Sequence, residues 1–263
     1  MSAGETPPAR GVEADERGRR YGTIVVVGGG CYGSYYVRQL ARAREHGALG
    51  WERLVVVDRD RGCRVATEPP DGSARHDAEV VVSEWTPFFG EYLAVACGEG
   101  HQRDAIVPSP LMPNLMLDWL VARARERWPE RVVETRAVGE VPGVPWQRAS
   151  PDGSHYVSFA EWMCPINCIE PARCPETRGP RSWSLPPAVR EFVAAEQARG
   201  RPLFGPAIFH CRHRAFGVGM VDTADVVAGD RLVRDAGTPG AADVLVGTTS
   251  HCHGALGIVG IGG

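Results

Sequence analysis

The chain has 263 residues, of which 43% are hydrophobic and 23% charged, with a net charge of −3. This length fits one large domain or two small ones, and the balance of residue types is that of ordinary globular proteins. The charge gives no reason to expect nucleic acid as a partner. The chain contains no lysine, which excludes Schiff-base catalysis, covalent pyridoxal phosphate attachment and a Walker A nucleotide site.

The N-terminal segment 1–20, MSAGETPPARGVEADERGRR, lacks the apolar core of a signal peptide, so we expect a disordered arm. No apolar run in the chain approaches the roughly 20 residues that span a bilayer. We therefore expect a cytoplasmic protein with no membrane insertion.

A glycine-rich turn between two buried strands is the first motif. Residues 23–33 read TIVVVGGGCYG, and the apolar spacing that follows predicts a helix. The next apolar stretch, LVVVDRD, predicts a second strand that ends at Asp58. Strand, glycine turn, helix and strand in this order predict a βαβ unit.

Each residue of the turn has an expected role in binding a dinucleotide. Gly28 allows the tight turn, Gly30 lets the backbone approach a pyrophosphate, and Gly33 lets the helix pack against the strand. Asp58 can accept hydrogen bonds from a ribose. Cys31 and Tyr32 complete the candidate site, although both are bulkier than the residues that usually stand at these positions of the loop. The alternative is a scaffold whose phosphate site is empty or filled by its own loops.

The segment from about 22 to 62 resembles the dinucleotide-binding Rossmann superfamily, and it looks like the ligand-binding domain of TrkA-type potassium-uptake regulators. That resemblance implies an NAD(P) or FAD cofactor at the glycine turn.

The alternation of strands and helices continues to about residue 140. We predict strands at 78–85, 104–110 and 131–138, with a helix at 113–128 between the last two. The predicted fold class is α/β: a doubly wound, mostly parallel, Rossmann-like sheet over residues 21–140.

Residues 141–263 are predicted to form a Cys/His-rich region, possibly packed into the same domain. After a Pro/Gly-rich junction we expect a strand near 155–163 and an amphipathic helix at 188–199. Ala228-Gly229-Asp230 suggests a hairpin turn. A buried strand beginning near Ala242 should end in a loop that carries His251, Cys252 and His253.

The cysteine segment MCPINCIEPARCP, residues 163–175, contains three of the eight cysteines of the chain. Cys164, Cys168 and Cys174 match neither paired zinc-ribbon spacing nor a complete ferredoxin motif. The part CPINCIEP resembles the end of a ferredoxin cluster loop. Thiolates ligate iron, and proline after a ligand stiffens the loop.

Three thiols need a fourth ligand to hold a cubane cluster or a tetrahedral zinc ion. Cys252 is the first choice, because it follows a buried strand. Cys211 in HCRH is the second. A histidine from HCRH or SHCHG (His210, His213, His251 or His253) is the third. We expect a 4Fe–4S cluster, with zinc as the alternative and free or reversibly oxidised thiols as a third possibility.

The two motifs together predict a nucleotide-binding redox protein, either an oxidoreductase or an electron-transfer subunit with a redox partner protein. The alternatives are a regulatory module that senses nucleotide and redox or metal state, and a protein with a structural zinc site. The sequence contains no G-x-S-x-G and no H-E-x-x-H motif, and it identifies no catalytic residue.

Overall fold

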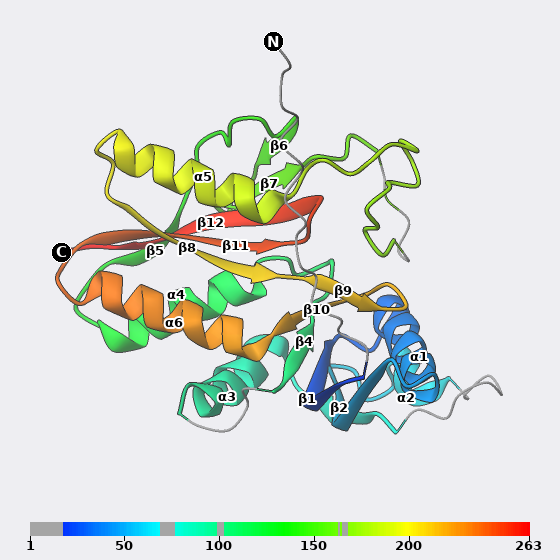
Figure 1. The fold of residues 1–263 in the computed structure, drawn as a ribbon. Helices are drawn as coiled ribbons and strands as arrows, with labels where there is room; N and C mark the ends of the chain where they lie inside the picture. Colours follow the sequence, from blue (N-terminus) through cyan, green and yellow to red (C-terminus); the bar gives the residue numbers. More distant parts are fainter. Residues whose placement is uncertain (1–17, 69–76, 99–102, 163, 165–167) are drawn as a thin grey trace, which may run out of the picture.

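The structure is a computed structural model, and it describes residues 18–68, 77–98, 103–162, 164 and 168–263. The expected arm at 1–20 lies almost wholly outside these residues. The fold is mixed α/β, with two mixed sheets and the helices packed around them (Figure 1).

The first sheet has the strand order β3-β2-β1-β4-β10-β9. Its members are β1 (Arg19–Val27), β2 (Leu49–Asp58), β3 (Glu79–Val82), β4 (Ala105–Val107), β9 (Arg212–Ala215) and β10 (Val218–Asp222). The first four strands pair in parallel, whereas β10 pairs antiparallel with β4 and with β9. The predicted strands at 78–85 and 104–110 are therefore present, although shorter than expected.

The second sheet has the order β6-β7-β12-β11-β8, and β5 also pairs with β12. Its strands are β5 (Val133–Arg136), β6 (Trp146–Ala149), β7 (His155–Ser158), β8 (Leu203–His210), β11 (Ala242–Thr249) and β12 (His253–Ile261). Only the pairing of β8 with β11 is parallel.

The expectation of a single doubly wound sheet over 21–140 was wrong for its last strand. β5 forms where the sequence predicts a strand, but it pairs antiparallel with the end of β12. Strand propensity marks β5 locally, whereas its partner lies more than 100 residues later and leaves no local signal.

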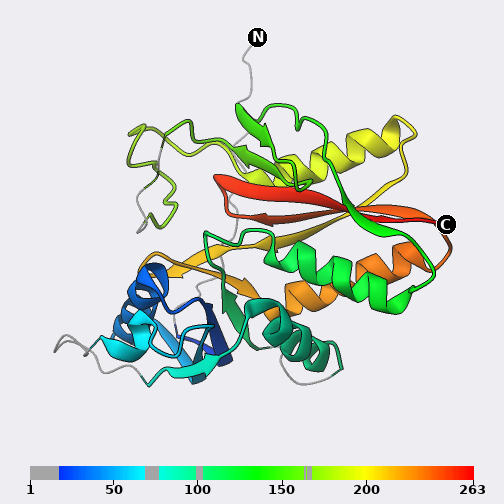
Figure 2. The same ribbon diagram turned by 180° about the vertical axis from the view of Figure 1, so that it is seen from behind.

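The helices cover both faces of both sheets (Figures 1 and 2). They are α1 (Cys31–Glu45), α2 (Arg64–Thr67), α3 (Trp85–Gly98), α4 (Leu115–Arg127), α5 (Leu185–Ala198) and α6 (Thr223–Gly237). Helix α1 packs on the Ile24 and Val26 face of β1, whereas α3 packs on the face that carries Val25 and Val27. This alternation is the period of two expected of a strand that is buried on both faces.

One hydrophobic core joins the two sheets. Buried residues of α3, α4 and α6 form one hydrophobic cluster with those of β1, β2 and β4 of the first sheet and β11 and β12 of the second. Helix α5 covers the opposite face of the second sheet with Leu185, Val189 and Val193. The chain also passes directly from β8 in one sheet to β9 in the other at Cys211. The predicted boundary near residue 140 stays a prediction. Each sheet contains strands from both sides of that position, and the two sheets share one core.

Two further expectations have clear outcomes. The amphipathic helix predicted at 188–199 is confirmed as α5, with Val189, Phe192 and Val193 buried. The hairpin turn at Ala228-Gly229-Asp230 was wrong, because these residues lie inside α6. Buried residues recur there at helical spacing, and Gly229 lets the helix approach Phe209 closely.

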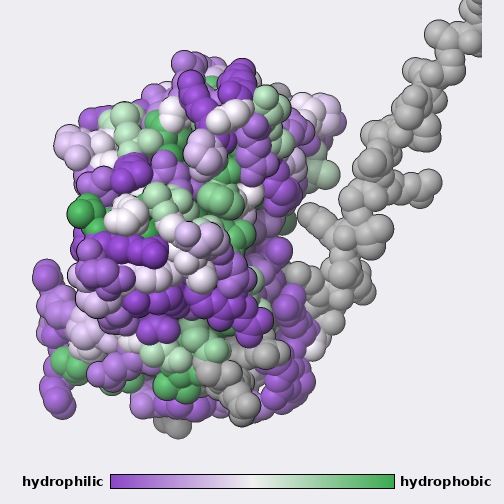
Figure 3. All heavy atoms as spheres, turned by 90° about the vertical axis from the view of Figure 1, so that its left-hand side faces the viewer, coloured by the Kyte–Doolittle hydropathy of each residue, from purple (hydrophilic) through white to green (hydrophobic). Residues whose placement is uncertain are grey.

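The described part of the chain contains no helix that combines the length and the apolarity needed to cross a bilayer. The face of the molecule in Figure 3 is covered mainly by hydrophilic side chains, with scattered hydrophobic ones.

Two glycines of the turn should respond oppositely to alanine. A Cβ at Gly33 would overlap the carbonyl oxygen of Gly28, whereas one at Gly30 meets nothing within 4 Å. We expect Gly33→Ala to destabilise the fold by about 1–3 kcal/mol or more. Gly30→Ala should cost about 0.5 kcal/mol, since only a helix cap is altered. Urea unfolding of both variants measures this, and equal stability would contradict the close packing of α1 on β1.

Candidate metal centre and glycine-rich loop

The cysteine loop, defined here as residues 159–184, leaves β7 and returns to α5. Both of its ends are tied to the turn between β11 and β12. The backbone N–H of Phe159 donates to the Cys252 carbonyl at 2.9 Å, and that of Leu185 donates to the His251 carbonyl at 2.8 Å. The loop therefore stands directly against the SHCHG turn, and this contact explains why distant cysteines meet.

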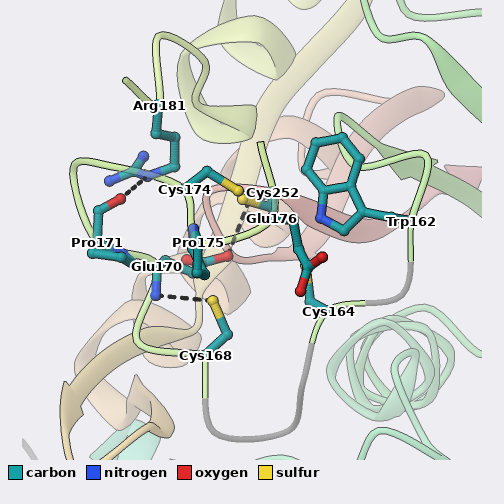
Figure 4. Close-up of a pocket in the computed structure, with 10 residues that line it drawn as sticks. All are labelled: Trp162, Cys164, Cys168, Glu170, Pro171, Cys174, Pro175, Glu176, Arg181 and Cys252. Atoms are coloured by element: carbon teal, nitrogen blue, oxygen red, sulfur yellow. Dashed lines mark hydrogen bonds between the residues drawn. The ribbon is translucent and has the colours of Figure 1, made fainter. Parts of the chain in front are cut away.

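Four cysteines line one pocket beneath this loop (Figure 4). They are Cys164, Cys168 and Cys174 from the loop and Cys252 from the turn. The other lining residues are Trp162, Glu170, Pro171, Pro175, Glu176 and Arg181. The structure thus brings together the four cysteines that the sequence analysis selected as ligands. Met163 and residues 165–167 lie outside the described residues.

The other candidates for the fourth ligand do not line the pocket. The Cys211 thiol lies beside Gly219, where β9 meets β10. His213 donates from Nδ1 to the Cys168 carbonyl, and His253 Nδ1 lies 2.9 Å from Ser158 Oγ. His210 and His251 meet edge to face, with ring centroids 4.8 Å apart. Of these side chains, His213 and His251 contact the cysteine loop, at the Cys168 carbonyl and at Ser184 Oγ.

The thiols differ in environment. Burial raises the pKa of Cys252 to about 12, against an opposing effect of the Trp183 N–H. Burial and then the neighbouring Cys168 raise the pKa of Cys164. The backbone N–H of Thr177 lowers the pKa of Cys174. Cys164 and Cys252 are therefore neutral at pH 7 unless a bound cation stabilises their thiolates.

N–H groups are directed at these sulfur atoms. The Glu170 backbone donates to Cys168 Sγ at 3.4 Å, and Trp183 Nε1 donates to Cys252 Sγ at 3.3 Å. The Thr177 and Glu176 backbones donate to Cys174. Such donors stabilise negative charge on sulfur, as the outer shell of a metal–thiolate site does.

No group of three or more His, Cys, Asp or Glu side chains within the described ranges is arranged so that it could hold a metal ion. The four thiols share a pocket, and binding one centre requires them to move closer together. The ligand set therefore stays a prediction.

Glu170 connects the cysteine loop to the turn, and the sequence analysis missed it. Oε1 accepts hydrogen bonds from Ser250 Oγ at 2.6 Å and the Cys252 N–H at 3.2 Å, and Oε2 accepts one from the His251 N–H at 3.0 Å. Burial acts to raise the pKa of this carboxyl, but the Ser250 hydrogen bond and the nearby His213 and His251 bring it below its usual value. Glu170 is thus a buried anion held by three donors.

The backbone of Glu170 has a φ of +48°. This left-handed conformation costs a side-chain-bearing residue about 1–3 kcal/mol, and the three hydrogen bonds of its carboxylate offset that cost. No residue pattern marks this role, because the partners of Glu170 lie 80 residues later. Trp183 was missed for the same reason.

The glycine-rich loop lies where the sequence analysis placed it, between β1 and α1. Gly28 has a φ of +86°, as a tight turn requires, and Gly33 packs against the backbone of Gly28. The space beside Gly30 is open. Cys31 is the first residue of α1, and Tyr32 is exposed on its first turn.

Asp58 stands at the end of β2, next to this loop. Its Oδ2 accepts a hydrogen bond from the Gly29 N–H at 2.6 Å, and its Oδ1 accepts one from the Asp60 N–H at 2.8 Å. The carboxylate therefore holds the loop itself, and a ribose would have to share it. The Arg64 guanidinium lies beside the loop, 3.6 Å from Cys31 Sγ.

Replacing Glu170 by glutamine should loosen the contact between the loop and the turn. The amide loses the negative charge and presents an N–H₂ group to donors, so we expect Glu170→Gln to destabilise the fold by about 1.5–3 kcal/mol. Glu191→Gln, on the exposed side of α5, is the matched control and should change stability by less than about 0.5 kcal/mol. Chemical denaturation of both variants tests this. An unchanged Glu170→Gln would show that the carboxylate does not hold the loop.

No curated protein and no solved structure matches the chain significantly. A family described as an uncharacterized protein, C-terminal domain (AF_1314_C), matches residues 116–262. The matched region extends from α4 to β12 and includes all four pocket cysteines, whereas the glycine-rich loop lies outside it. The match covers more than half of the chain, which therefore belongs to the AF_1314_C family.

Proposed function

We propose that this protein binds a metal centre through Cys164, Cys168, Cys174 and Cys252, and that the centre is a 4Fe–4S cluster. The observation that carries the proposal is the convergence of four thiols from two distant segments on one pocket. Ordinary packing gives no reason for such a set in a chain whose other four cysteines do not line this pocket.

The surroundings of the thiols support a thiolate centre. Backbone and indole N–H groups donate to Cys168, Cys174 and Cys252, and the indole of Trp162 lies beside Cys164. N–H donors to sulfur and a largely apolar wall tune the reduction potential of an iron–sulfur cluster. Pro175 follows Cys174 directly, which fixes the backbone next to a ligand.

A single zinc ion is the second candidate, and the size of the pocket favours it. The pocket has an internal volume of about 10 Å³, close to the space that one water molecule occupies in a cavity. One tetrahedral ion requires less movement of the loop than a cubane cluster does, since zinc–sulfur bonds are about 2.3 Å long.

The second part of the proposal concerns the glycine-rich loop. The four parallel strands in the order β3-β2-β1-β4 are arranged as in one half of a doubly wound dinucleotide-binding sheet. Gly28, Gly30, Cys31, Tyr32, Gly33 and Asp58 form the loop and its carboxylate, and the N-terminus of α1 offers N–H groups to a phosphate. We propose NAD(P) or FAD as its ligand.

Together the two sites favour a redox protein, either an oxidoreductase or an electron-transfer subunit that serves a partner protein. The sites are connected through one strand: β9 contacts α1, and its His213 bonds to the Cys168 carbonyl. The same connection suits the alternative of a regulatory module that senses nucleotide and redox state.

Metal analysis separates the candidates. Protein purified anaerobically should contain iron and acid-labile sulfide and be brown; stoichiometric zinc with no sulfide would favour the second candidate. Single Cys→Ser variants at positions 164, 168, 174 and 252 should lose most of the metal, because each removes one ligand. Cys63→Ser, beside Gly29, is the control and should retain it. Metal-free wild-type protein, or full retention in the Cys252 variant, would contradict the proposed centre.

Nucleotide binding has its own test. A Cβ at Gly30 meets no atom within 4 Å, so a valine there is directed into open space, through which a pyrophosphate would approach. We expect Gly30→Val to reduce NAD(H) or FAD affinity at least tenfold while its thermal unfolding stays close to that of the wild type. Titration calorimetry with each nucleotide measures the affinity. No binding by the wild type would remove the nucleotide from the proposal and leave the metal centre untouched.

A further inference from the structure

A second, larger pocket lies next to the thiol pocket. It has a volume of about 420 Å³ and is lined by Trp146, Tyr156, Val157, Ser158, Ala160, Glu161, Trp162, His253 and Gly254. This volume is within the range of about 300–1,000 Å³ that is typical of small-molecule sites. Trp162 belongs to both pockets and forms the wall between them.

The floor of this pocket is built by the second sheet. Trp146 of β6, Ser158 of β7 and His253 of β12 pair across the strands in one row. Residues that pair in this way point to the same face of a sheet, and Tyr156, two positions before Ser158, shares that face. The register of the three strands therefore gathers two aromatic rings and an imidazole, and the cysteine loop adds Trp162.

Trp146 is 42% exposed, which is high for the largest aromatic side chain. Trp162 is held in place by Trp183, with ring centroids 6.3 Å apart and planes at 70°. Among the described residues, the arginines found over aromatic rings stack on Tyr21, Trp51, Trp128 and Phe216. Within the described residues no arginine stacks on Trp146, Tyr156 or Trp162, although Arg148 pairs with Tyr156 across β6 and β7 and so lies on the same face.

His253 and Glu161 supply acceptors to the pocket, whereas the indoles of Trp146 and Trp162 and the hydroxyl of Tyr156 can donate. Ser158 Oγ donates to the Ala160 carbonyl at 2.8 Å and accepts from the Ala160 N–H at 2.9 Å. Because its proton is used there, Ser158 accepts from His253 Nδ1, 2.9 Å away. In that tautomer the second ring nitrogen of His253 is an acceptor. Glu161 adds an exposed carboxylate at the rim.

We propose that this pocket binds a small organic ammonium ion. Three aromatic side chains attract a cation through their ring faces, the Glu161 carboxylate complements its charge, and His253 accepts a hydrogen bond from its N–H group. The floor of this site belongs to β6, β7 and β12 and includes none of the proposed metal or nucleotide ligands, whereas its wall, Trp162, is shared with the thiol pocket.

Titration calorimetry on the full-length protein, with benzylammonium as the probe, tests this inference. Neutral benzyl alcohol and anionic benzoate have the same ring and similar size, so they separate the effect of charge from that of the aromatic group. We expect benzylammonium to bind at least tenfold more tightly than benzyl alcohol and benzoate not to bind. Equal affinity for the alcohol, or tighter binding of benzoate, would overturn the assignment of a cation.

Two variants locate the site. Trp146→Ala should weaken benzylammonium binding about 5- to 30-fold through loss of one ring, and Glu161→Gln should weaken it about threefold or more and reduce its dependence on salt. Phe204→Ala is the matched control, because Phe204 is also 42% exposed but lies on β8. If Trp146→Ala unfolds, Glu161→Gln, an exposed isosteric change, decides alone. Binding that neither variant alters, or none by the wild type, would overturn the proposal.

Discussion

The carboxylate of Glu170 is the contact on which the cysteine pocket depends. It belongs to the cysteine loop and accepts three hydrogen bonds from the turn between β11 and β12. A carboxylate that is buried in this way is stable only when donors surround it. The turn supplies them because Ser250 and the N–H groups of His251 and Cys252 all point outward from the end of the hairpin. The position of Cys252 beside the loop thiols follows from that geometry.

The same turn connects the pocket to the rest of the molecule. β11 and β12 form the centre of the second sheet, and their buried valines join the core that α4 and α6 share with the first sheet. The neighbouring strand β8 continues through Cys211 into β9, which carries His213 to the back of the cysteine loop. The loop is therefore supported from both sheets, although few of its described side chains are buried.

The sequence predicted individual helices and strands better than it predicted which of them pair or pack with one another. The glycine turn, the helix after it and Asp58 could be predicted because all three belong to one known motif that spans about 30 residues. Buried spacing also predicted α5. The sheet that contains β5 could not be predicted, since a short strand carries no record of its distant partner. At Gly229 a local pattern gave a wrong prediction. A glycine beside an aspartate suggests a turn, but in the structure this glycine lies inside α6 and lets the helix approach Phe209.

The residues of the candidate site, too, could be predicted only in part. The clustered cysteines and the position of Cys252 after a buried strand were enough to select Cys252 as the partner of the loop thiols, and the structure places it in their pocket. Glu170 and Trp183 could not be identified, because one acid in a proline-rich loop and one tryptophan before a helix are common features. Both ends of the cysteine loop bond to adjacent residues, His251 and Cys252. The loop therefore leaves the second sheet and returns to it at the same place. Related chains could have a longer or shorter loop there without any change in the register of the strands.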